Sequence, residues 1–517
     1  MNRLLLVGLA SIVLYCFGIT ARYPLMVGLQ EPRGSWATTV GASWEALGAH
    51  VGVYAALTVC YVLALTSALT LRDTAHVRHR IVGVWLLCAL VLLGAYPGGE
   101  SHDLFDYLFR GRMMAEFGVS PLAVTPDLFR RSPYYLYISW HAHVDTYGPL
   151  WEYTSATIAA SVRGALQLAG WWSNGLPTCP SGPESCHMLI AYITGYRILA
   201  IGLAGVSGAL IYRMVRRARP AQAPAALLAW LWNPVLLIGT ALGAHNDSLM
   251  IALLLLALSL FQHRRWLLGL LVVGLAAHVK LTALLLAPVI GIWLVRQIGW
   301  RHAIGLALVT CAILLPLSWL LYAPLGGWAT LPRMLNERGL FLAGSPAHVF
   351  YRWLHHIQGW EATDARELLT RSATLLFAGI AAVLVGRLYH APHQADESSL
   401  LWRAAATITL AYLLIGSFWF QHWYILWVLA PAALLPHMAI TRIFVPWYGF
   451  GALAANVVGN MAGTVIEPMP NRFILAAIDV TVILGPLLLA LLGVTLQQVR
   501  HRQAIRPRQT SALHTPQ

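Results

Sequence analysis

Long apolar runs separated by short polar connections dominate the amino-acid sequence. A helix that crosses ~30 Å of hydrocarbon needs about 20 apolar residues, and many of the runs approach this length. The candidate spans cover residues 4–20, 50–71, 81–96, 188–212, 222–242, 249–262, 266–278, 281–295, 303–323, 367–389, 402–417, 424–440, 443–465 and 473–496. The stretch 266–295 is also compatible with one long tilted helix. The pattern predicts an all-α polytopic membrane protein with about 12–14 transmembrane helices.

The polar connections predict how the chain is oriented. Arginine concentrates in short segments at 72–80, 213–219, 263–265, 296–302 and 499–508, and the positive-inside rule assigns such segments to the cytoplasm. The long connection 97–187 then faces outward, and the tail 499–517 is cytoplasmic. Residues 151–170 are amphipathic, which predicts a helix lying at the outer membrane interface. No Pro-rich linker divides the chain, so 1–517 is predicted to form a single domain.

Composition excludes several protein classes. Of 517 residues, 58% are hydrophobic and only 10% are charged, whereas soluble proteins carry about 25% charged residues. A soluble enzyme, a disordered protein and a collagen-like or disulfide-framework protein are therefore excluded. The net charge of +14 comes from arginine clusters between apolar runs, which indicates membrane orientation rather than nucleic-acid binding. Cys179 and Cys186 share one hydrophilic loop, and a disulfide there would require the oxidising side of the membrane.

Acidic residues are scarce, which makes the start of the long loop distinctive. The segment GGESHDLFDYLFRGR carries Glu100, Asp103 and Asp106. The two aspartates are three residues apart and would share one face of a helix. A carboxylate at the water boundary could remove the proton from a hydroxyl that attacks an anomeric carbon. The alternative is structural, because acids in a first helical turn complement the helix dipole.

The second half of this loop, SPYYLYISWHAHVDTYGPLW, is rich in aromatic residues. Tyr147 and Trp151, like Tyr107 upstream, could stack against sugars, although aromatic side chains also anchor helices at membrane interfaces. His141 and His143 form a His-x-His pair, but a pair alone is weak evidence for a metal site. We therefore expect neither a metal nor a cofactor.

Two further polar sites interrupt apolar sequence. His245, Asn246 and Asp247 are consecutive in a turn between apolar runs, where helix capping explains one polar residue but not three. Lys280 is the only lysine in the chain. Its ammonium group, near the outer boundary, suits the phosphate of a lipid carrier. Snorkelling of the side chain towards the interface is the alternative.

The late segment SFWFQHWY combines an aromatic belt with Gln421 and His422, two hydrogen-bonding groups placed where a lipid head group would lie. Elsewhere the sequence lacks the common nucleotide-binding and hydrolase motifs. It has no P-loop, no GxGxxG after a strand, no HExxH and no nucleophile elbow. An enzyme of this kind must draw an activated substrate from the membrane.

Four segments together resemble the GT-C superfamily of membrane glycosyltransferases. DLFDYLFRGRMMAEFGVSPL resembles the first-loop motif, and the matching positions are Asp103, Tyr107, Gly111, Arg112, Gly118 and Pro121. TYGPLWE at 146–152 resembles the element that follows. WNPVLLIGTALGAHNDSLM is similar to a segment of the polyprenol-phosphate-mannose-dependent α-mannosyltransferases, and FQHWYILWVLAP resembles their late motif. The four matches occur in family order.

The resemblance implies an inverting glycosyltransferase whose donor carries mannose or another hexose on a polyprenyl monophosphate. In that family a first-loop carboxylate is the general base, and the motif register assigns this role to Asp103, with Asp106 as second candidate. The candidates for contacting the donor phosphate or sugar are Lys280, His245, Asn246, Asp247, Arg112, Gln421 and His422. Tyr107, Tyr147 and Trp151 would stack on the donor or acceptor sugar. The partners implied are membrane lipid and a glycan or glycolipid acceptor, without nucleic acid.

We expect this protein in the plasma membrane, with its active site on the extracytoplasmic side. Two other function classes fit the same hydropathy. A transporter or flippase of a lipid-linked or hydrophilic solute would place charged residues in mid-span and use paired broken helices, whereas most acids here lie in predicted outward loops. A non-catalytic assembly subunit would depend on neither loop aspartate.

Overall fold

The computed structural model describes residues 2–172, 179, 186–339, 341–392, 397–465 and 471–510. Over these residues the secondary structure is helical, and β-structure is limited to two isolated bridges. The end of the basic tail, 511–517, and part of the predicted outward connection 97–187 lie outside the described residues, as do residues 466–470. The predicted all-α class is confirmed.

The helices follow one another in the order that the apolar runs predict. The long ones are α1 (Asn2–Val13), continued by η1 (Leu14–Thr20), α4 (Trp44–Ala68), α5 (Ala75–Leu92), α8 (His187–Ala218), α14 (Trp300–Tyr322), α17 (Ala362–Tyr389), α18 (Glu397–Ala411), continued by η11 (Tyr412–Gly416), α20 (Val445–Val465) and α21 (Arg472–Thr510). Shorter apolar helices are α9 (Ala223–Leu231), α10 (Pro234–Leu237), η8 (Ile238–Leu242), α11 (Asp247–Gln262), α12 (Trp266–Ala277), η9 (Leu281–Leu286), α13 (Ala287–Ile298) and α19 (Ile425–Ala433).

Among the described residues, eight helical segments are long and apolar enough to cross a membrane, or nine if the bent pair α9 and α10–η8 counts as one span. The sequence predicts about fourteen spans, and part of the difference comes from helix length. In addition, the predicted spans 281–295 and 303–323 lie in one continuous segment, Leu281–Leu325. Predicted spans such as 249–262 and 266–278 are helices of only 16 and 12 residues. Many long helices expose apolar side chains, and none of the most apolar window of α17 is buried. A surface of this kind suits lipid, so the polytopic membrane class is confirmed.

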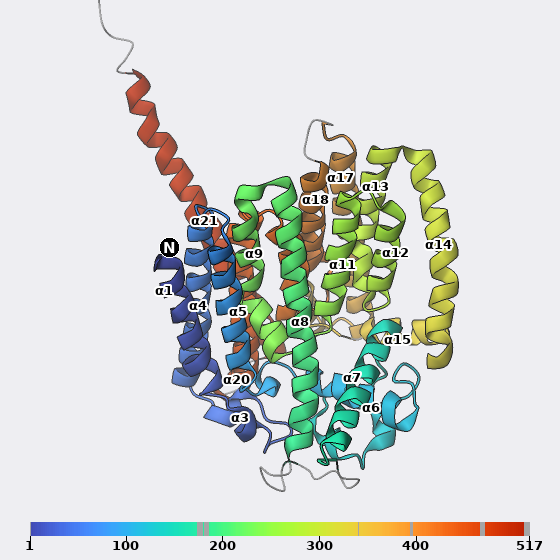
Figure 1. The fold of residues 1–517 in the computed structure, drawn as a ribbon. Coiled ribbons are helices and arrows are strands. Elements are labelled where there is room, and N and C mark those ends of the chain that lie inside the picture. The colour runs from blue at the N-terminus through green and yellow to red at the C-terminus, as the bar shows by residue number, and fades with distance from the viewer. Residues whose placement is uncertain are drawn as a thin grey trace, which may run out of the picture.

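The first-loop helices and the arginine-rich connections lie at opposite ends of the bundle (Figure 1). Figure 1 shows α3 (Trp36–Val40), α6 (Asp103–Phe117) and α7 (Pro149–Leu168) at one end, and the α8–α9 and α13–α14 connections at the other. α7 coincides with the predicted amphipathic helix and packs against α6. Despite its 20 residues, α7 is not among the helices apolar enough to span.

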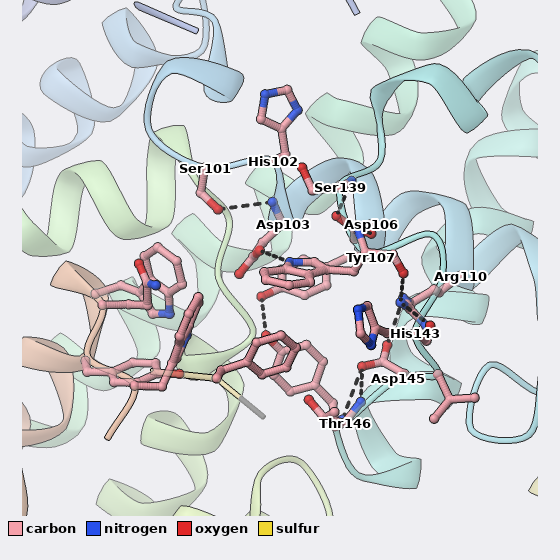
Figure 2. A pocket seen from close by; sticks show the side chains of 18 of the residues that line it. Ser101, His102, Asp103, Asp106, Tyr107, Arg110, Ser139, His143, Asp145 and Thr146 are labelled. Atoms are coloured by element: carbon pink, nitrogen blue, oxygen red, sulfur yellow. Dashed lines mark hydrogen bonds and ion pairs between the residues drawn. The ribbon is translucent and has the colours of Figure 1, made fainter. Parts of the chain in front are cut away.

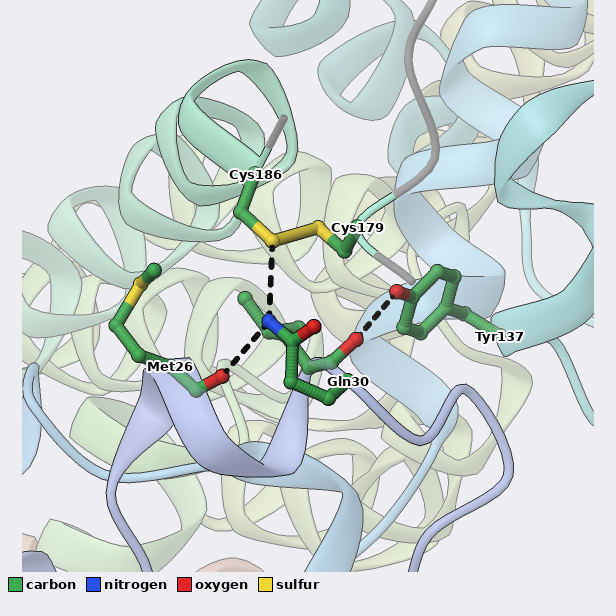
Figure 3. Close-up of a disulfide and its surroundings, with 6 residues drawn as sticks. Met26, Gln30, Tyr137, Cys179 and Cys186 are labelled. Atoms are coloured by element: carbon green, nitrogen blue, oxygen red, sulfur yellow. Dashed lines mark hydrogen bonds between the residues drawn. A yellow bond between two sulfur atoms is a disulfide. The ribbon is translucent and has the colours of Figure 1, made fainter. Parts of the chain in front are cut away.

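A disulfide lies at the same end as the first-loop helices (Figure 3). Cys179 is joined to Cys186, the residue that precedes α8. The amide Nε2 of Gln30 donates to Cys186 Sγ at 3.9 Å, and the hydroxyl of Tyr137 donates to the carbonyl of Leu29 at 2.6 Å. The loop that begins at residue 97 is thereby packed against the segment between η1 and α3.

One buried arginine holds together the two segments that lead into the candidate site. Arg197 lies in the middle of α8 with a fully buried side chain. Its guanidinium donates to the carbonyls of Leu242 at 2.9 Å, Leu93 at 3.0 Å and Ala95 at 2.9 Å. Leu93 and Ala95 follow the end of α5, and Leu242 ends η8. A guanidinium presents several donors in a fixed plane, which lets one side chain satisfy three carbonyls at helix ends.

We expect Arg197→Met to destabilise the protein by about 3 kcal/mol or more, because three buried carbonyls would each lose a charged donor. Thermal unfolding of the detergent-solubilised protein measures the effect as a lowered melting temperature. Arg217→Met, at an exposed position near the end of the same helix, is the matched control and should change stability little. Equal melting temperatures for both variants would contradict the structural role of Arg197.

Candidate active site

Asp103 and Asp106 lie in the first turn of α6 and face one cavity (Figure 2). Asp103 Oδ1 accepts a hydrogen bond from the indole Nε1 of Trp140 at 3.3 Å. Asp106 accepts from two backbone amides, those of Ser139 and Trp140, each at 3.1 Å. Both carboxylate oxygens of Asp106 are therefore occupied in holding the loop. Within the described parts of the chain, Asp103 Oδ2 accepts no backbone hydrogen bond, so it is better placed to accept a proton.

Burial shifts the acidity of both carboxyl groups. Burial raises the pKa of Asp103. The electrostatic effect of His245 and the hydrogen bond from Trp140 lower this pKa, but they offset the effect of burial only in part. Burial also raises the pKa of Asp106, to about 7, against the opposing charge of Arg110. A raised pKa makes a carboxylate a stronger base, and paired perturbed carboxyl groups in a cavity are typical of catalytic sites.

The loop over the cavity is anchored to α6 by a buried arginine. Arg110 donates to the carbonyls of Trp140 and His143, both at 3.0 Å, and its Nε lies 3.5 Å from Asp145 Oδ2. Asp145 Oδ1 in turn accepts from the backbone amides of Thr146 and Tyr147. Because these groups are buried and paired, the loop holds Trp140 and Tyr147 in fixed positions around Asp103.

The cavity has a volume of about 260 Å³. Acidic groups form one wall and aromatic rings form the others. Its lining includes Glu100, Asp103, Asp106, Tyr107, Trp140, Tyr147, Phe341, Trp419, Gln421, Trp423 and Tyr424. Aromatic faces beside hydrogen-bonding carboxylates are suited to carbohydrate, whose C–H faces and hydroxyl edges need both.

The YGPLW element brings this cavity against the broken helix that carries Lys280. The Gly148 amide donates to the Val279 carbonyl at 2.9 Å, and the Leu150 amide donates to the His278 carbonyl at 2.9 Å. A Cβ atom at Gly148 would lie 2.1 Å from the His278 carbonyl oxygen, so only glycine permits this approach. Tyr147 is thereby fixed beside Lys280, whose Nζ lies 5.3 Å from the Tyr147 ring centre.

Lys280 and Asp247 form a buried ion pair between two helix ends. Lys280 Nζ lies 2.9 Å and 3.1 Å from the two carboxylate oxygens of Asp247, and Trp427 Nε1 also donates to Asp247. The ammonium group packs against the rings of Tyr424 and Trp427 at 4.6 Å and 5.0 Å. Carboxylate and ring faces together compensate the cost of burying the ammonium charge.

An apolar groove lies next to the cavity, and Lys280 is one of its lining residues. Its volume is about 470 Å³, and its lining includes Leu281, Leu284, Leu285, Pro288, Met334, Leu335, Phe377, Ile408 and Tyr412. Thr146 lines both the groove and the cavity. The two spaces are therefore adjacent, with the cationic Lys280 at their junction.

A second buried polar cluster lies behind Asp103. His245 Nε2 lies 3.1 Å from Glu100 Oε1, and His422 Nε2 contacts the same oxygen. The two imidazoles outweigh the effect of burial and lower the pKa of Glu100 to about 2. Ala244 adopts a left-handed backbone with φ of 50°, which ends η8 and directs His245 towards Glu100. Among the described residues, Glu100, His245 and His422 form the group whose side-chain types and spacing could hold a metal ion.

The structure brings together some of the residues predicted from sequence and separates others. Asp103, Asp106, Tyr107, Tyr147 and Gln421 line the cavity. Lys280 lies at the groove, and Asp247 is its ion-pair partner. Trp151 is buried against Tyr107 with ring centres 5.0 Å apart, so it supports the cavity wall. His245 and His422 bind Glu100, and the buried Asn246 side chain has no hydrogen-bond partner among the described residues.

Arg112 lies outside the cavity, and the two loop histidines do not act as a pair, although His143 lines the cavity. Arg112 forms an ion pair with Glu116 at 2.7 Å and lines a different pocket. His141 hydrogen-bonds Asp127 and His143 hydrogen-bonds Glu337, so the two imidazoles of the His-x-His pair have separate partners.

Glu100 and Trp140 are the site residues that sequence reasoning did not assign. Glu100 is one of only 20 acidic residues in the chain, and scarcity in apolar sequence is a signal that could have singled it out. Trp140 carries no such signal, because it is one of 21 tryptophans. Only the folded loop places its indole against Asp103.

Two comparisons with known proteins identify the family of the chain. The family model described as alpha-(1->6)-mannopyranosyltransferase, N-terminal domain, matches residues 5–296. The chain is also 28% identical over 213 residues to alpha-(1->6)-mannopyranosyltransferase A of Corynebacterium glutamicum. That alignment covers 40% of this chain and 36% of the relative, so the chain matches about a third of the relative's length. The family match spans more than half of the chain and includes Glu100, Asp103, His245, Asp247 and Lys280.

Proposed function

Because the chain belongs to the alpha-(1->6)-mannopyranosyltransferase family, we propose that it transfers mannose from a polyprenyl-monophosphate donor to a hydroxyl of a glycan or glycolipid, with inversion at the anomeric carbon. The observation that carries this proposal is the junction at Lys280. An apolar groove, a buried cation and a polar cavity containing Asp103 meet there in the order of a prenyl chain, a phosphate and a sugar. For the linkage we propose the α-(1→6) bond named for the family, which inversion would form from a β-linked donor.

In this mechanism Asp103 removes the proton from the acceptor hydroxyl as its oxygen attacks the anomeric carbon. The bond between that carbon and the phosphate oxygen breaks, and polyprenyl phosphate leaves with the bonding electron pair. Lys280 stabilises the negative charge that develops on the leaving phosphate. Asp247 accepts hydrogen bonds from the ammonium group and holds it at the groove. Because an ammonium group has three N–H donors, Lys280 can also donate to a phosphate. Asp106 and Arg110 hold the loop that carries Trp140 in place through hydrogen bonds to its backbone.

We propose that the cavity opens on the extracytoplasmic side of the plasma membrane. Two observations support this orientation. The cavity end of the bundle lies opposite the arginine-rich connections (Figure 1), as the positive-inside rule requires for an outward site. The Cys179–Cys186 disulfide lies at the cavity end, and disulfides persist in oxidising compartments.

Asp103→Asn should reduce transfer by about 10²- to 10⁴-fold, the usual contribution of a general base. Purified protein in vesicles, supplied with polyprenyl-phosphate mannose and a mannoside acceptor, gives the rate by mass analysis of the product. Asp364→Asn, at an exposed position in the first turn of α17, removes the same group from another helix start and should leave the rate unchanged. A folded, fully active Asp103→Asn protein would refute the assignment of the base.

The rate should depend on pH through the raised pKa of Asp103. The ionised form is the base, so kcat/KM should fall as the pH decreases through a value above the ordinary aspartate pKa of about 4. Trp140→Phe removes the indole donor that stabilises the ionised form, and it should move this acid limb to higher pH. A pH profile of the wild type that stays flat down to pH ~4 would contradict the prediction, provided that the protein remains folded.

Leu285→Trp should raise KM for a long-chain donor about tenfold, because a larger side chain fills the groove that binds the prenyl chain. A donor with a short prenyl chain should be affected much less. Leu308→Trp, at an exposed position on α14, is the matched control. Equal effects of Leu285→Trp on both donors would show that the chain does not occupy this groove.

A further inference from the structure

Three side chains of metal-binding types converge next to the candidate base from segments far apart in the sequence. Glu100 precedes α6, His245 precedes α11 and His422 begins η12 (His422–Tyr424). One ligand atom from each lies within 4.8 Å of the other two. The side chains of Glu100 and His245 are 0% exposed, and that of His422 is 1% exposed. Two imidazoles and a carboxylate that converge in this way are side-chain types found together in metal sites.

Hydrogen bonds within the cluster do not satisfy it. Both Nε2 atoms converge on the single oxygen Oε1 of Glu100. Glu100 Oε2, His245 Nδ1 and His422 Nδ1 are buried without a hydrogen-bond partner among the described residues. Unsatisfied buried polar atoms are costly, and their concentration in one place points to a ligand.

The backbone around the cluster is built to keep it open. A Cβ atom at Gly243 would lie 2.4 Å from Glu100 Oε2 and 2.8 Å from His245 Nε2. Any larger residue would therefore push into the two donor groups. Asn456 Nδ2 donates to the backbone carbonyl of Glu100 at 3.0 Å, and the His245 ring stacks on Trp423 at 3.7 Å. Two of the three ligands are thus held in place from outside the cluster.

We propose that Glu100, His245 and His422 bind one divalent transition-metal ion of the zinc class. Two imidazole nitrogens and a carboxylate are a common donor set for such ions. Bonds of about 2.0–2.2 Å in tetrahedral geometry separate neighbouring ligand atoms by about 3.3–3.6 Å, and His245 Nε2 lies 3.1 Å from Glu100 Oε1. Glu100 Oε2 is available as a fourth donor.

The metal would act on the site through His245. Its Nε2 faces the metal position, whereas its Nδ1 lies 3.8 Å from Asp103 Oδ2. Metal bound at Nε2 leaves the proton on Nδ1, and metal-bound histidines commonly direct this N–H at a carboxylate. Glu100 and His422 would then be positioning residues, and the ion would fix the tautomer of His245 and orient Asp103. Metal binding is a property of the chain that does not require the proposed transfer reaction.

Elemental analysis of the full-length protein, purified in detergent and freed of any affinity tag, tests the site. We expect about one equivalent of zinc or another divalent transition metal per chain. Glu100→Gln and His422→Phe should each retain less than about one tenth of it. His263→Gln, at an exposed histidine between α11 and α12, should retain all of it. Asp103→Asn should also keep the metal, because Asp103 is not a ligand.

Metal-free protein prepared with a chelator provides the second measurement. Added zinc should raise its melting temperature, and should fail to raise that of the Glu100→Gln variant. A folded protein that holds no metal and gains no stability from zinc, manganese or cobalt would overturn the proposal. A protein that keeps its metal but transfers no mannose would leave the site intact and refute the proposed function instead.

Discussion

The candidate site depends on one buried guanidinium. Arg197, deep inside α8, bonds the carbonyls of Leu93, Ala95 and Leu242. These carbonyls end two helices whose next residues lead to Glu100 and His245. Within an apolar bundle a helix can stop only where its last carbonyls find donors. The arginine supplies those donors for two helices at once, and so it determines where both polar turns emerge.

The same principle explains why the chemistry is concentrated at breaks in helices. η8 ends at Leu242, two residues before the left-handed Ala244, and α12 ends before the extended backbone of Lys280. At each break a polar side chain, His245 or Lys280, points into the interior of the bundle. A continuous apolar helix would have no such polar side chain at that position. At the second break, the carbonyls of His278 and Val279 accept hydrogen bonds from backbone amides of the YGPLW element. Helix breaks, the loop and the charged side chains therefore form one assembly.

Buried charges in this assembly are compensated locally. Lys280 pairs with Asp247, Arg110 with Asp145, and Glu100 with two histidines. Asp103 has weaker compensation, with one indole hydrogen bond and an imidazole 3.8 Å away. Burial raises the pKa of both aspartates. What distinguishes Asp103 is that the backbone amides of Ser139 and Trp140 occupy both carboxylate oxygens of Asp106. The motif register ranks Asp103 before Asp106, and their different partners in the folded loop give the physical reason to separate their roles.

The sequence by itself determined the membrane class, the order of the helices and the residues of the first-loop motif, because hydropathy and local spacing are written along the chain. It also singled out His245, Asp247 and Lys280, since polar residues in apolar runs are conspicuous. Their partners were decided by the tertiary structure alone. Glu100 and His422 are 322 residues apart, and Arg112 turned to Glu116 within its own helix. Contacts between distant segments depend on how helices pack, and no local pattern records that.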